Sequence, residues 1–383
     1  MSQPFGIGVV GFGNRVGGLV SQLVAEHPQI SLAAVCDPAT ESVAAAQRLS
    51  PTVQVCASLQ QMLGNPQVGW VLIGSPNNLH KEHAIAAMHS GRNVFCEKPL
   101  ATNLADCLQI RDAVKETGKM FFFGLVLRYA PLYVRVRSLL DQRLIGEIIS
   151  IDFNETLGFN HGGYIHQDWR RHRDAAGSHM LEKCCHDIDI VNWMVGSRAT
   201  HVASFGGLRY FIPENRGIAD SIGPNPANGR RAFQDWPQSN RDPFTRDKDI
   251  VDHQVAIIEY ANGVRASFHT NCVAAIPERR LLLLGTHGAI RADLNTGLVE
   301  MQKIGWDEPR VIYRSTSTAA DHAGADAQIV VALADSILKG AAPRTGIDHA
   351  INSAVTCFGI DTALDERRVV EMNTLWRRAG LEV

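Results

Sequence analysis

Residues 179–195 combine groups able to move protons with the spacing of a helix. Five of their side chains follow positions i, i+3, i+4, i+7 and i+11 and would share one helical face: Glu182, Cys185, His186, Asp189 and Trp193. We expect one continuous helix here. Its opposite, core-facing stripe would be Leu181, Cys184, Ile188, Val191 and Val195.

His186 is the candidate general base, because an imidazole titrates near neutral pH. Glu182 is expected to orient a substrate or to tune that imidazole. A lone helix histidine is more often structural, but the adjacent Glu182-Lys183 pair favours function. The run Cys184-Cys185-His186 does not predict a metal site, because adjacent cysteines point to different helix faces and no second ligand cluster exists.

A glycine-rich turn near the N-terminus predicts a nucleotide site. Gly11-Phe12-Gly13 ends the first strand-like run. Gly11 permits a tight turn, and Gly13 lets backbone N–H groups approach a pyrophosphate at the start of the following helix. The third glycine of the usual pattern is replaced by Val16, so we expect a loop one residue longer or a helix slightly off the strand.

Asp37, at the end of the second strand-like run, could accept hydrogen bonds from both ribose hydroxyls of a dinucleotide. Pro38, Ala39 and Thr40 follow it, so no cation is present to receive a 2′-phosphate. The pattern therefore favours NAD(H) over NADP(H). The alternative is that Asp37 only caps the turn before Pro38.

Several segments resemble the Gfo/Idh/MocA family, named for glucose-fructose oxidoreductase and inositol dehydrogenase. They span nearly the whole chain in the order found in that family. The matching segments are Gly74-Ser75-Pro76-Asn77-Asn78-Leu79-His80, Glu97-Lys98-Pro99-Leu100, Leu127-Arg128-Tyr129-Ala130-Pro131, Leu144-Ile145-Gly146-Glu147-Ile148 and Glu182-Lys183-Cys184-Cys185-His186-Asp187-Ile188-Asp189.

The resemblance implies hydride transfer between nicotinamide and a sugar, inositol or related hydroxy compound. It also implies that Lys98 stabilises oxygen charge while His186 moves the proton. Without the resemblance, Lys98 is better explained as a solvated lysine at a strand end, flanked by Pro99. The expected cofactor contacts are Gly11, Phe12, Gly13, Asn14, Arg15, Asp37, Ser75, Pro76, Asn77, His80, Glu97 and Lys98.

The loop of residues 154–173 suits a polyhydroxylated ring, because it concentrates amide, carboxylate, imidazole, aromatic and guanidinium groups. Arg170, Arg171 and Arg173 could also hold an acidic substituent, although at least two of them are more simply explained as a solvated basic loop. The expected substrate contacts are Arg128, Tyr129, Asn154, Glu155, His161, Tyr164, Trp169, Arg170 and Lys183.

The order of predicted elements indicates an α/β protein of two domains. Residues 1–125 alternate β-branched apolar runs with helical patterns, which is typical of a doubly wound, parallel Rossmann sheet. Residues 126–383 contain several strands in succession, which predicts a second domain with an antiparallel or mixed sheet. The family resemblance implies that this is an α/β domain with a large open sheet, which we expect to be mostly antiparallel. In this family such a sheet often forms the oligomer interface, so we expect a homodimer or homotetramer. Residues 212–249 read as a long irregular segment.

Composition narrows the classes of partner. The net charge is −2, from 37 Lys and Arg against 39 Asp and Glu, which predicts binding neither to nucleic acid nor to a membrane surface. The eight scattered cysteines show no disulfide rhythm, and no segment has the pattern of a signal peptide or a membrane span. We therefore expect a cytoplasmic protein that acts on a small carbohydrate-like molecule.

Three functions remain open from the sequence. The first is an NAD-dependent dehydrogenase or reductase of CH–OH groups. The second, known within the family, is cleavage of a glycoside with NAD as a transient oxidant and no net redox change. The third is a non-enzymatic NAD-binding protein, because fold alone does not establish chemistry.

Overall fold

The computed structural model describes residues 5–234, 241–315 and 319–382. The chain divides into two compact units, Met1–Ala130 with Gly324–Ala354, and Pro131–Ala323 with Val355–Val383. We expected the first domain to consist of residues 1–125. In the structure, residues 324–354 also belong to the first unit. The predicted fold class is confirmed for both parts of the chain.

The first unit is built on a parallel sheet that has, among the described residues, six strands in the order β3-β2-β1-β4-β5-β6. The central strands are apolar and buried on both faces, as expected where helices cover both sides. Because β1 lies between β2 and β4, the strand order reverses beside it, and ligands bind at the carboxyl ends of such strands. The strands are β1 (Phe5–Val10), β2 (Ile30–Cys36), β3 (Gln54–Val55), β4 (Val68–Ile73), β5 (Asn93–Cys96) and β6 (Phe121–Phe123).

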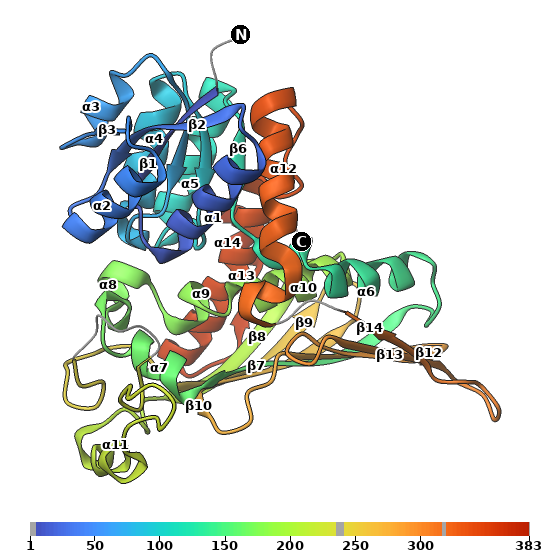
Figure 1. The fold of residues 1–383 in the computed structure, drawn as a ribbon. Coiled ribbons are helices and arrows are strands. Elements are labelled where there is room, and N and C mark those ends of the chain that lie inside the picture. The colour runs from blue at the N-terminus through green and yellow to red at the C-terminus, as the bar shows by residue number, and fades with distance from the viewer. Residues whose placement is uncertain (1–4, 235–240, 316–318, 383) are drawn as a thin grey trace. The chain divides into compact units, whose positions relative to one another are not determined.

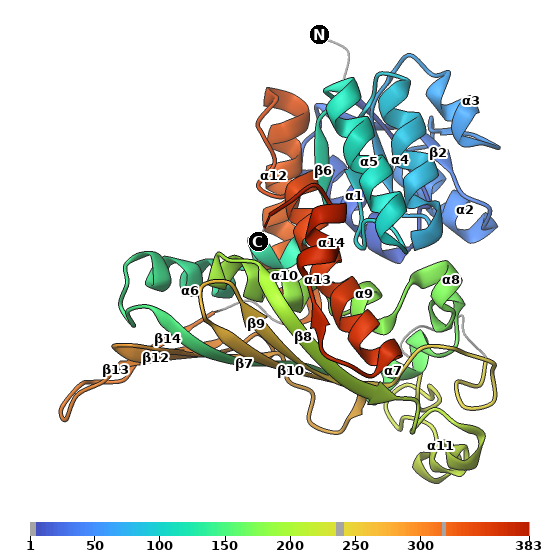
Figure 2. The same ribbon diagram turned by 180° about the vertical axis from the view of Figure 1, so that it is seen from behind.

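Helices cover both faces of this sheet. Helices α1 and α12 lie on one face, and α4 and α5 lie on the other (Figure 1, Figure 2). Helix α12 belongs here because its apolar stripe, which includes Ile329, Leu333 and Ile337, is buried. The helices of this unit are α1 (Asn14–Glu26), α2 (Thr40–Leu49), α3 (Leu59–Leu63), α4 (His80–His89), α5 (Leu104–Thr117) and α12 (Ala325–Lys339), with short turns η1 (Asn77–Leu79) and η2 (Val126–Tyr129).

The second unit holds, within the described ranges, a sheet of nine strands in the order β14-β13-β12-β11-β7-β10-β9-β8-β15. Strands β7 and β10 are parallel, whereas their other neighbours are antiparallel. We did not predict β12, β14 or β15. The strands are β7 (Ile148–Gly158), β8 (Ala199–Gly207), β9 (His253–Tyr260), β10 (Arg265–Ala274), β11 (Arg280–Gly285), β12 (Gly288–Asp293), β13 (Leu298–Lys303), β14 (Val311–Arg314) and β15 (Val370–Glu371).

One face of this sheet is covered by helices that include α6 and α10 (Figure 2). The other face exposes large apolar side chains, with Phe205 70%, Ile257 63% and Val255 45% exposed. The helices are α6 (Pro131–Asp141), α7 (Phe159–Ile165), α8 (Arg173–Ala176), α9 (His179–Glu182), α10 (Cys185–Val195), α11 (Gly217–Ile222), α13 (Ile347–Glu366), which runs across the unit boundary, and α14 (Asn373–Arg378).

The single helix expected over residues 179–195 is wrong in two respects. The chain forms α9 and α10 with a break at Lys183 and Cys184, where the N–H of Cys184 donates to the carbonyl of His179, five residues back. Helix α10 is also buried nearly all round, polar residues included, so it has no solvent-facing polar side. Periodicity missed this because an ion pair of Asp187 and hydrogen bonds of Asn192 replace solvent around buried polar groups of this helix.

Residues 212–249, expected to be irregular, contribute to a small aromatic core instead of lying loose on the surface. Phe211, Phe233 and Phe244 are almost completely buried and pack with Leu157, Ile165, Ile250 and Cys272. Short helix α11 lies within the same segment. Within the described residues 212–234 and 241–249, the segment therefore packs on β7, β10 and α7 through Leu157, Cys272 and Ile165.

Candidate active site

The loop after β1 leaves a phosphate-sized approach to the backbone. Gly11 has φ +81°, and a Cβ there would lie 2.4 Å from the amide nitrogen of Ser75, so only glycine fits. A Cβ at Gly13 would meet no atom within 4 Å. Helix α1 starts at Asn14 with no side-chain cap and no acidic residue in its first turn, so its N–H groups remain suited to an anion.

Val16 is accommodated by a glycine on the neighbouring strand end. Its side chain is buried, and a Cβ added at Gly74 would lie 2.3 Å from Val16 Cγ2. The close approach of helix and sheet that usually needs a third glycine in the helix is therefore supplied by Gly74. This departure from the pattern leaves the loop itself at three residues, Gly11-Phe12-Gly13.

Asp37 shapes the same loop from the end of β2. Its Oδ2 accepts the N–H of Phe12 at 2.7 Å, and its Oδ1 accepts the N–H of Ala39 at 2.8 Å. The side chain is half-buried. Each carboxylate oxygen still has acceptor capacity, so the group can both shape the loop and receive ribose hydroxyls.

Beyond β4, Ser75 and Asn77 are buried and Pro76 is half-buried. The hydroxyl of Ser75 lies 2.9 Å from Nδ1 of His83. His80, expected to contact the cofactor, is 1% exposed and lies between two carbonyl oxygens of the protein. It braces the loops instead of facing a ligand.

The turn after β5 carries Glu97 and Lys98. Glu97 is 7% exposed; its Oε1 accepts from Arg15 Nε at 3.0 Å and its Oε2 accepts from the backbone N–H of Lys98 at 3.3 Å. Lys98 is half-buried. The backbone of Lys98 is therefore connected, through one carboxylate, to Arg15 in the first turn of α1.

These features fit a dinucleotide. The glycine loop, the uncapped start of α1 and Asp37 together match the pyrophosphate and ribose of NAD. In addition, Nη2 of Arg15 is buried and has no hydrogen-bond partner among the described residues, so one donor remains for a ligand there. The residues that would hold the cofactor are Gly11, Phe12, Gly13, Asn14, Arg15, Asp37, Ser75, Pro76 and Asn77.

In the second unit, Arg170 gathers several of the residues predicted to contact substrate. Its Nε donates to Glu182 at 3.1 Å, and its Nη1 donates to Asp168 at 2.7 Å and to the hydroxyl of Tyr164 at 2.8 Å. The guanidinium also lies 4.3 Å from the ring centroid of Trp169. Arg170 therefore fixes the position of Glu182. We had expected Arg170 to contact the substrate directly.

Burial shifts the pKa values of two groups that contact Arg170, namely Asp168 and Tyr164. Burial raises the pKa of Asp168, although Arg170 opposes the shift. Burial likewise raises the pKa of Tyr164, which keeps its phenol protonated. His161 lies beside Tyr164, with ring centroids 6.1 Å apart. The cluster thus offers a hydroxyl, aromatic faces and a carboxylate close together.

His186 lies in the first turn of α10 and is 5% exposed. The next residue, Asp187, forms a two-pronged ion pair with Arg279 at 2.8 and 2.7 Å. Arg279 also lies 3.1 Å from Glu155, which lies 3.6 Å from Lys183. This buried network anchors both sides of the break between α9 and α10.

The two carboxyl groups of this network have pKa values that are shifted in opposite directions. Burial raises the pKa of Asp187, and Arg279 only partly offsets this. Burial also disfavours ionised Glu155, but Arg279 and Lys183 outweigh it and lower the pKa of that carboxyl. We had assigned neither residue a role: Arg279 lies in none of the matching segments, and Asp187 was named only as part of one.

Other predicted substrate contacts are engaged within the fold. Asn154 donates to Glu278 at 3.0 Å and accepts from the N–H of Arg280 at 2.9 Å. Tyr129 is 2% exposed, with its hydroxyl 3.3 Å from Thr345 Oγ1. Both side chains therefore have hydrogen-bond partners within the protein, and buried Glu155 lies beside Lys183 and Arg279. Arg128 is 9% exposed in η2.

The remaining two loop arginines also have structural partners. Arg171 donates to the carbonyls of Asp168 and Asp247, at 2.8 and 3.0 Å. Arg173 forms a two-pronged pair with Asp365 at 3.0 and 2.8 Å. An acidic substituent on the substrate would therefore have to displace existing partners, which the arginine-rich sequence did not reveal.

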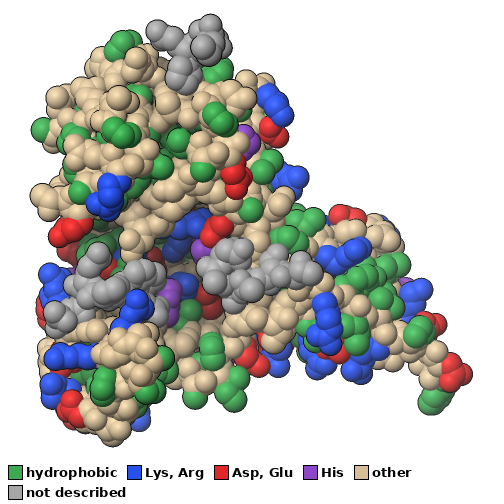
Figure 3. All heavy atoms as spheres, viewed as in Figure 1, with side chains coloured by type: hydrophobic (Ala, Val, Ile, Leu, Met, Phe, Trp, Pro, Cys, Tyr) green, Lys and Arg blue, Asp and Glu red, His purple; other side chains and the backbone are tan. Residues whose placement is uncertain are grey.

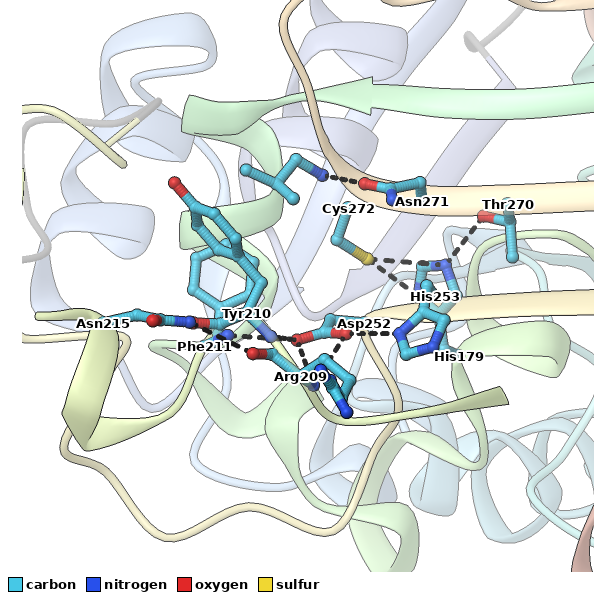
Figure 4. Close-up of polar contacts among 11 residues, drawn as sticks. His179, Arg209, Tyr210, Phe211, Asn215, Asp252, His253, Thr270, Asn271 and Cys272 are labelled. Carbon is cyan, nitrogen blue, oxygen red and sulfur yellow. Dashed lines mark hydrogen bonds and ion pairs between the residues drawn. The ribbon is translucent and has the colours of Figure 1, made fainter. Parts of the chain in front are cut away.

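A second polar cluster lies on β9, β10 and the segment after β8 (Figure 4). Asp252 accepts the N–H groups of Arg209, Tyr210 and Phe211, at 2.6 to 3.1 Å. Nearby, His179 Nε2 lies 3.2 Å from Thr270 Oγ1 and 3.6 Å from Cys272 Sγ. The contacts of Asp252 hold residues 209–211 in place. Neither set of contacts was foreseen from the sequence.

The surface carries charged side chains of both signs. Lys and Arg side chains are interspersed with Asp and Glu on the face shown in Figure 3. Among the described residues, no three His, Cys, Asp or Glu side chains are arranged to bind a metal ion. In the same ranges, no helix combines the length and apolar character needed to cross a bilayer.

Two family models match the chain. The oxidoreductase family with an NAD-binding Rossmann fold matches residues 5–125, and the GFO/IDH/MocA C-terminal domain matches residues 133–291. A 2,7-anhydro-N-acetylneuraminate hydratase of Escherichia coli (strain K12) is 26% identical over 288 residues, which are 75% of this chain and 67% of that protein.

An inositol 2-dehydrogenase/D-chiro-inositol 3-dehydrogenase of Lactiplantibacillus plantarum is 28% identical over 211 residues, 54% of this chain and 55% of that protein. The solved structure of a levoglucosan dehydrogenase in complex with NADH and levoglucosan aligns with a TM-score of 0.79 and 18% identity. The alignment covers 97% of this chain and all of that one, and it establishes a shared fold.

Proposed function

Because the chain belongs to the Gfo/Idh/MocA family of NAD-binding oxidoreductases, we propose that it oxidises a CH–OH group of a sugar, inositol or glycoside, or catalyses the reverse reduction. Bound NAD would supply the hydride acceptor. Relatives and a solved structure named for inositol and levoglucosan support this substrate class. Asp37, with no cation after it, supports NAD(H) over NADP(H).

The observation that carries the proposal is the connection, through Glu97, of Lys98 to Arg15 at the start of α1. Lys98 follows the carboxyl end of β5, and its N–H is held by Glu97, which is paired with Arg15. A cation placed among such residues stabilises the charge that develops on an oxygen as its proton leaves. We assign this role to Lys98.

We assign the proton transfer to His186 and its support to Glu182. A general base must accept the hydroxyl proton, and imidazole is suited to this near neutral pH. Glu182, fixed by Arg170, would orient a neighbouring hydroxyl of the substrate. Tyr164, Trp169 and His161 would offer the ring its faces and further hydrogen bonds.

The test is NADH absorbance after mixing the protein with NAD and a panel of inositols, aldoses, sugar acids and glycosides. We expect NADH to form with one class, and Lys98→Met and His186→Ala each to lower kcat by on the order of 100-fold or more. Lys115→Met, at an exposed position on α5, is the matched control. Full activity in both site variants would refute the assigned roles.

A second function is favoured by the 26% identity to the anhydro-sugar hydratase. The chain would then cleave or hydrate a glycoside and leave the redox state of the cofactor unchanged overall. Chromatography of the same mixtures distinguishes the two cases. A new sugar product without NADH accumulation supports the hydratase-like reaction, whereas equal amounts of product and NADH support the dehydrogenase.

We also propose that the protein is a homodimer or homotetramer joined through the open sheet face, and that it works in the cytoplasm. The exposed Phe205, Val255 and Ile257 support the first point, because apolar patches of this kind mark protein interfaces. The eight free thiols support the second. Light scattering after gel filtration tests the assembly, and Ile257→Asp should dissociate it.

A further inference from the structure

Arg15 connects three segments that are far apart in the sequence. It lies in the first turn of α1; its Nε donates to Glu97 Oε1 at 3.0 Å and its Nη1 to Asp326 Oδ1 at 2.5 Å. Glu97 is 82 positions away and Asp326 is 311 positions away. All three residues belong to the first unit.

The Glu97 end of this connection is tightly enclosed. The side chain of Glu97 is 9% exposed, and a Cβ added at Gly124 would lie 3.0 Å from its Oε2. Both carboxylate oxygens are used, one by Arg15 and one by the N–H of Lys98. If Arg15 moved, the carboxylate of Glu97 would therefore move with it, and so would the backbone N–H of Lys98 that donates to this carboxylate.

The second carboxylate, that of Asp326, lies on a helix near the C-terminal part of the chain. Asp326 is in the first turn of α12, which packs against α1 and η2. Burial disfavours the charged guanidinium, but Glu97 and Asp326 outweigh this and raise the pKa of Arg15. The arginine is thus held between two carboxylates from opposite ends of the sequence.

We propose that Arg15 and Asp326 are positioning residues, which hold the Glu97–Lys98 turn in its reactive geometry and couple that geometry to dinucleotide binding. Nη2 of Arg15, which has no hydrogen-bond partner among the described residues, is the donor through which a bound dinucleotide would contact the same guanidinium. This inference rests on the role proposed above for Lys98.

The first experiment measures the Lys98 turn without catalysis. Hydrogen–deuterium exchange of a peptide covering residues 93–104 is compared between wild type, Arg15→Gln and Asp326→Asn, each with and without NADH. We expect faster exchange in both variants and a smaller slowing by NADH. Asp335→Asn, on the same helix and in an ion pair with exposed Lys339, should exchange like wild type.

The second experiment uses NADH affinity and kinetics. NADH fluorescence titration should show weaker binding in Arg15→Gln and Asp326→Asn. With a substrate, kcat should fall roughly 10- to 100-fold while the substrate KM stays unchanged, as expected for misplacement of a reacting group. Asp326→Glu, which keeps the carboxylate, should recover most of kcat.

The outcomes separate the two proposals. If no substrate is found, the proposed function fails, but the exchange and NADH-binding results still test the positioning role. If Arg15→Gln and Asp326→Asn match wild type in exchange, NADH affinity and kcat, the positioning role is overturned. If both variants unfold, Arg15→Lys and Asp326→Glu are tested instead, because they keep the charges. Wild-type exchange and NADH affinity in Arg15→Lys and Asp326→Glu would support a role for the ion pairs. Loss of folding in these two variants as well would overturn the positioning role.

Discussion

Nδ1 of His80 lies 2.7 Å from the carbonyl oxygen of Pro99, the residue after Lys98. Its other ring nitrogen lies 3.0 Å from the carbonyl oxygen of Ser75. Only a protonated imidazole donates from both nitrogens. Burial lowers the pKa of His80, while the two carbonyls and Glu97 oppose this shift. The protonated ring joins the loop after β4 to the turn after β5 by donating from both nitrogens, whereas a neutral ring donates to only one of the two carbonyls.

We therefore expect His80→Ala to weaken both loops. Each buried carbonyl left without a donor costs about 1–3 kcal/mol. Thermal unfolding should occur at a lower temperature, and NADH fluorescence titration should show reduced affinity. His89→Ala, whose side chain is 46% exposed at the end of the same helix, is the control. Unchanged stability and NADH binding in His80→Ala would show that the brace is not formed.

The pair between Arg170 and Glu182 predicts coupled effects on catalysis. Arg170→Gln and Glu182→Gln should each lower kcat/KM roughly 10- to 100-fold, the range seen when a supporting residue is lost. The double variant should be little worse than either single one, because both remove the same contact. Steady-state kinetics of the three variants measure this.

Arg173→Gln is the matched control, because its partner Asp365 is 48% exposed and such pairs contribute only about 0.2–1 kcal/mol. Its kcat/KM should remain near that of wild type. Effects of Arg170→Gln and Glu182→Gln that simply multiply would contradict the contact.

Two buried histidines predict loss of stability in acid. Burial lowers the pKa of His166 to about 3 and that of His179 to about 4, from an ordinary value of 6.5. Between these values the unfolded chain binds more protons than the native one, so the free energy of unfolding falls as the pH drops below 6.5. Each unit of pKa difference corresponds to about 1.4 kcal/mol.

His166→Phe should make this dependence shallower. The ring of His166 stacks on Phe211 with centroids 4.3 Å apart, and its nitrogens have no hydrogen-bond partner among the described residues, so phenylalanine keeps the packing. Urea unfolding at several pH values measures the slope. His287→Gln, at an exposed turn, should keep the wild-type slope. The same slope in His166→Phe would rule out titration of His166 as a cause.

Asp37 predicts the choice of cofactor. Wild type should prefer NAD(H), because the carboxylate accepts ribose hydroxyls and repels a 2′-phosphate. Asp37→Ser should reduce the NAD/NADP affinity ratio by at least about tenfold, or ~1.4 kcal/mol. It should also weaken NAD binding, since the N–H of Phe12 loses its carboxylate acceptor. Titration with both cofactors measures the ratio.

Glu41→Gln removes a nearby carboxylate from the first turn of α2 and serves as the control for general charge. Its ratio should equal that of wild type. An Asp37→Ser ratio as high as the wild-type one would assign cofactor choice to other residues.

Local patterns were enough to predict the sheet architecture and the dinucleotide loop. Alternation of buried strands and helices depends on neighbouring residues, and a turn such as Gly11-Phe12-Gly13 is restricted by its own backbone. The first strand-like run, predicted to end at Gly11-Phe12-Gly13, is β1, Phe5–Val10. The family motifs added Lys98 and His186 as candidates.

Only the tertiary structure decided which polar groups meet. The contact of Arg15 with Asp326 joins residues 311 positions apart, and no local pattern records such a distance. The same holds for Arg279, whose pairs with Asp187 and Glu155 bury charge around α10. Asn154 and Tyr129 were assigned to substrate because their types suit it, yet the fold uses their hydrogen bonds internally. Residue type is a property of the sequence, whereas the partner of a polar group depends on how the whole chain packs.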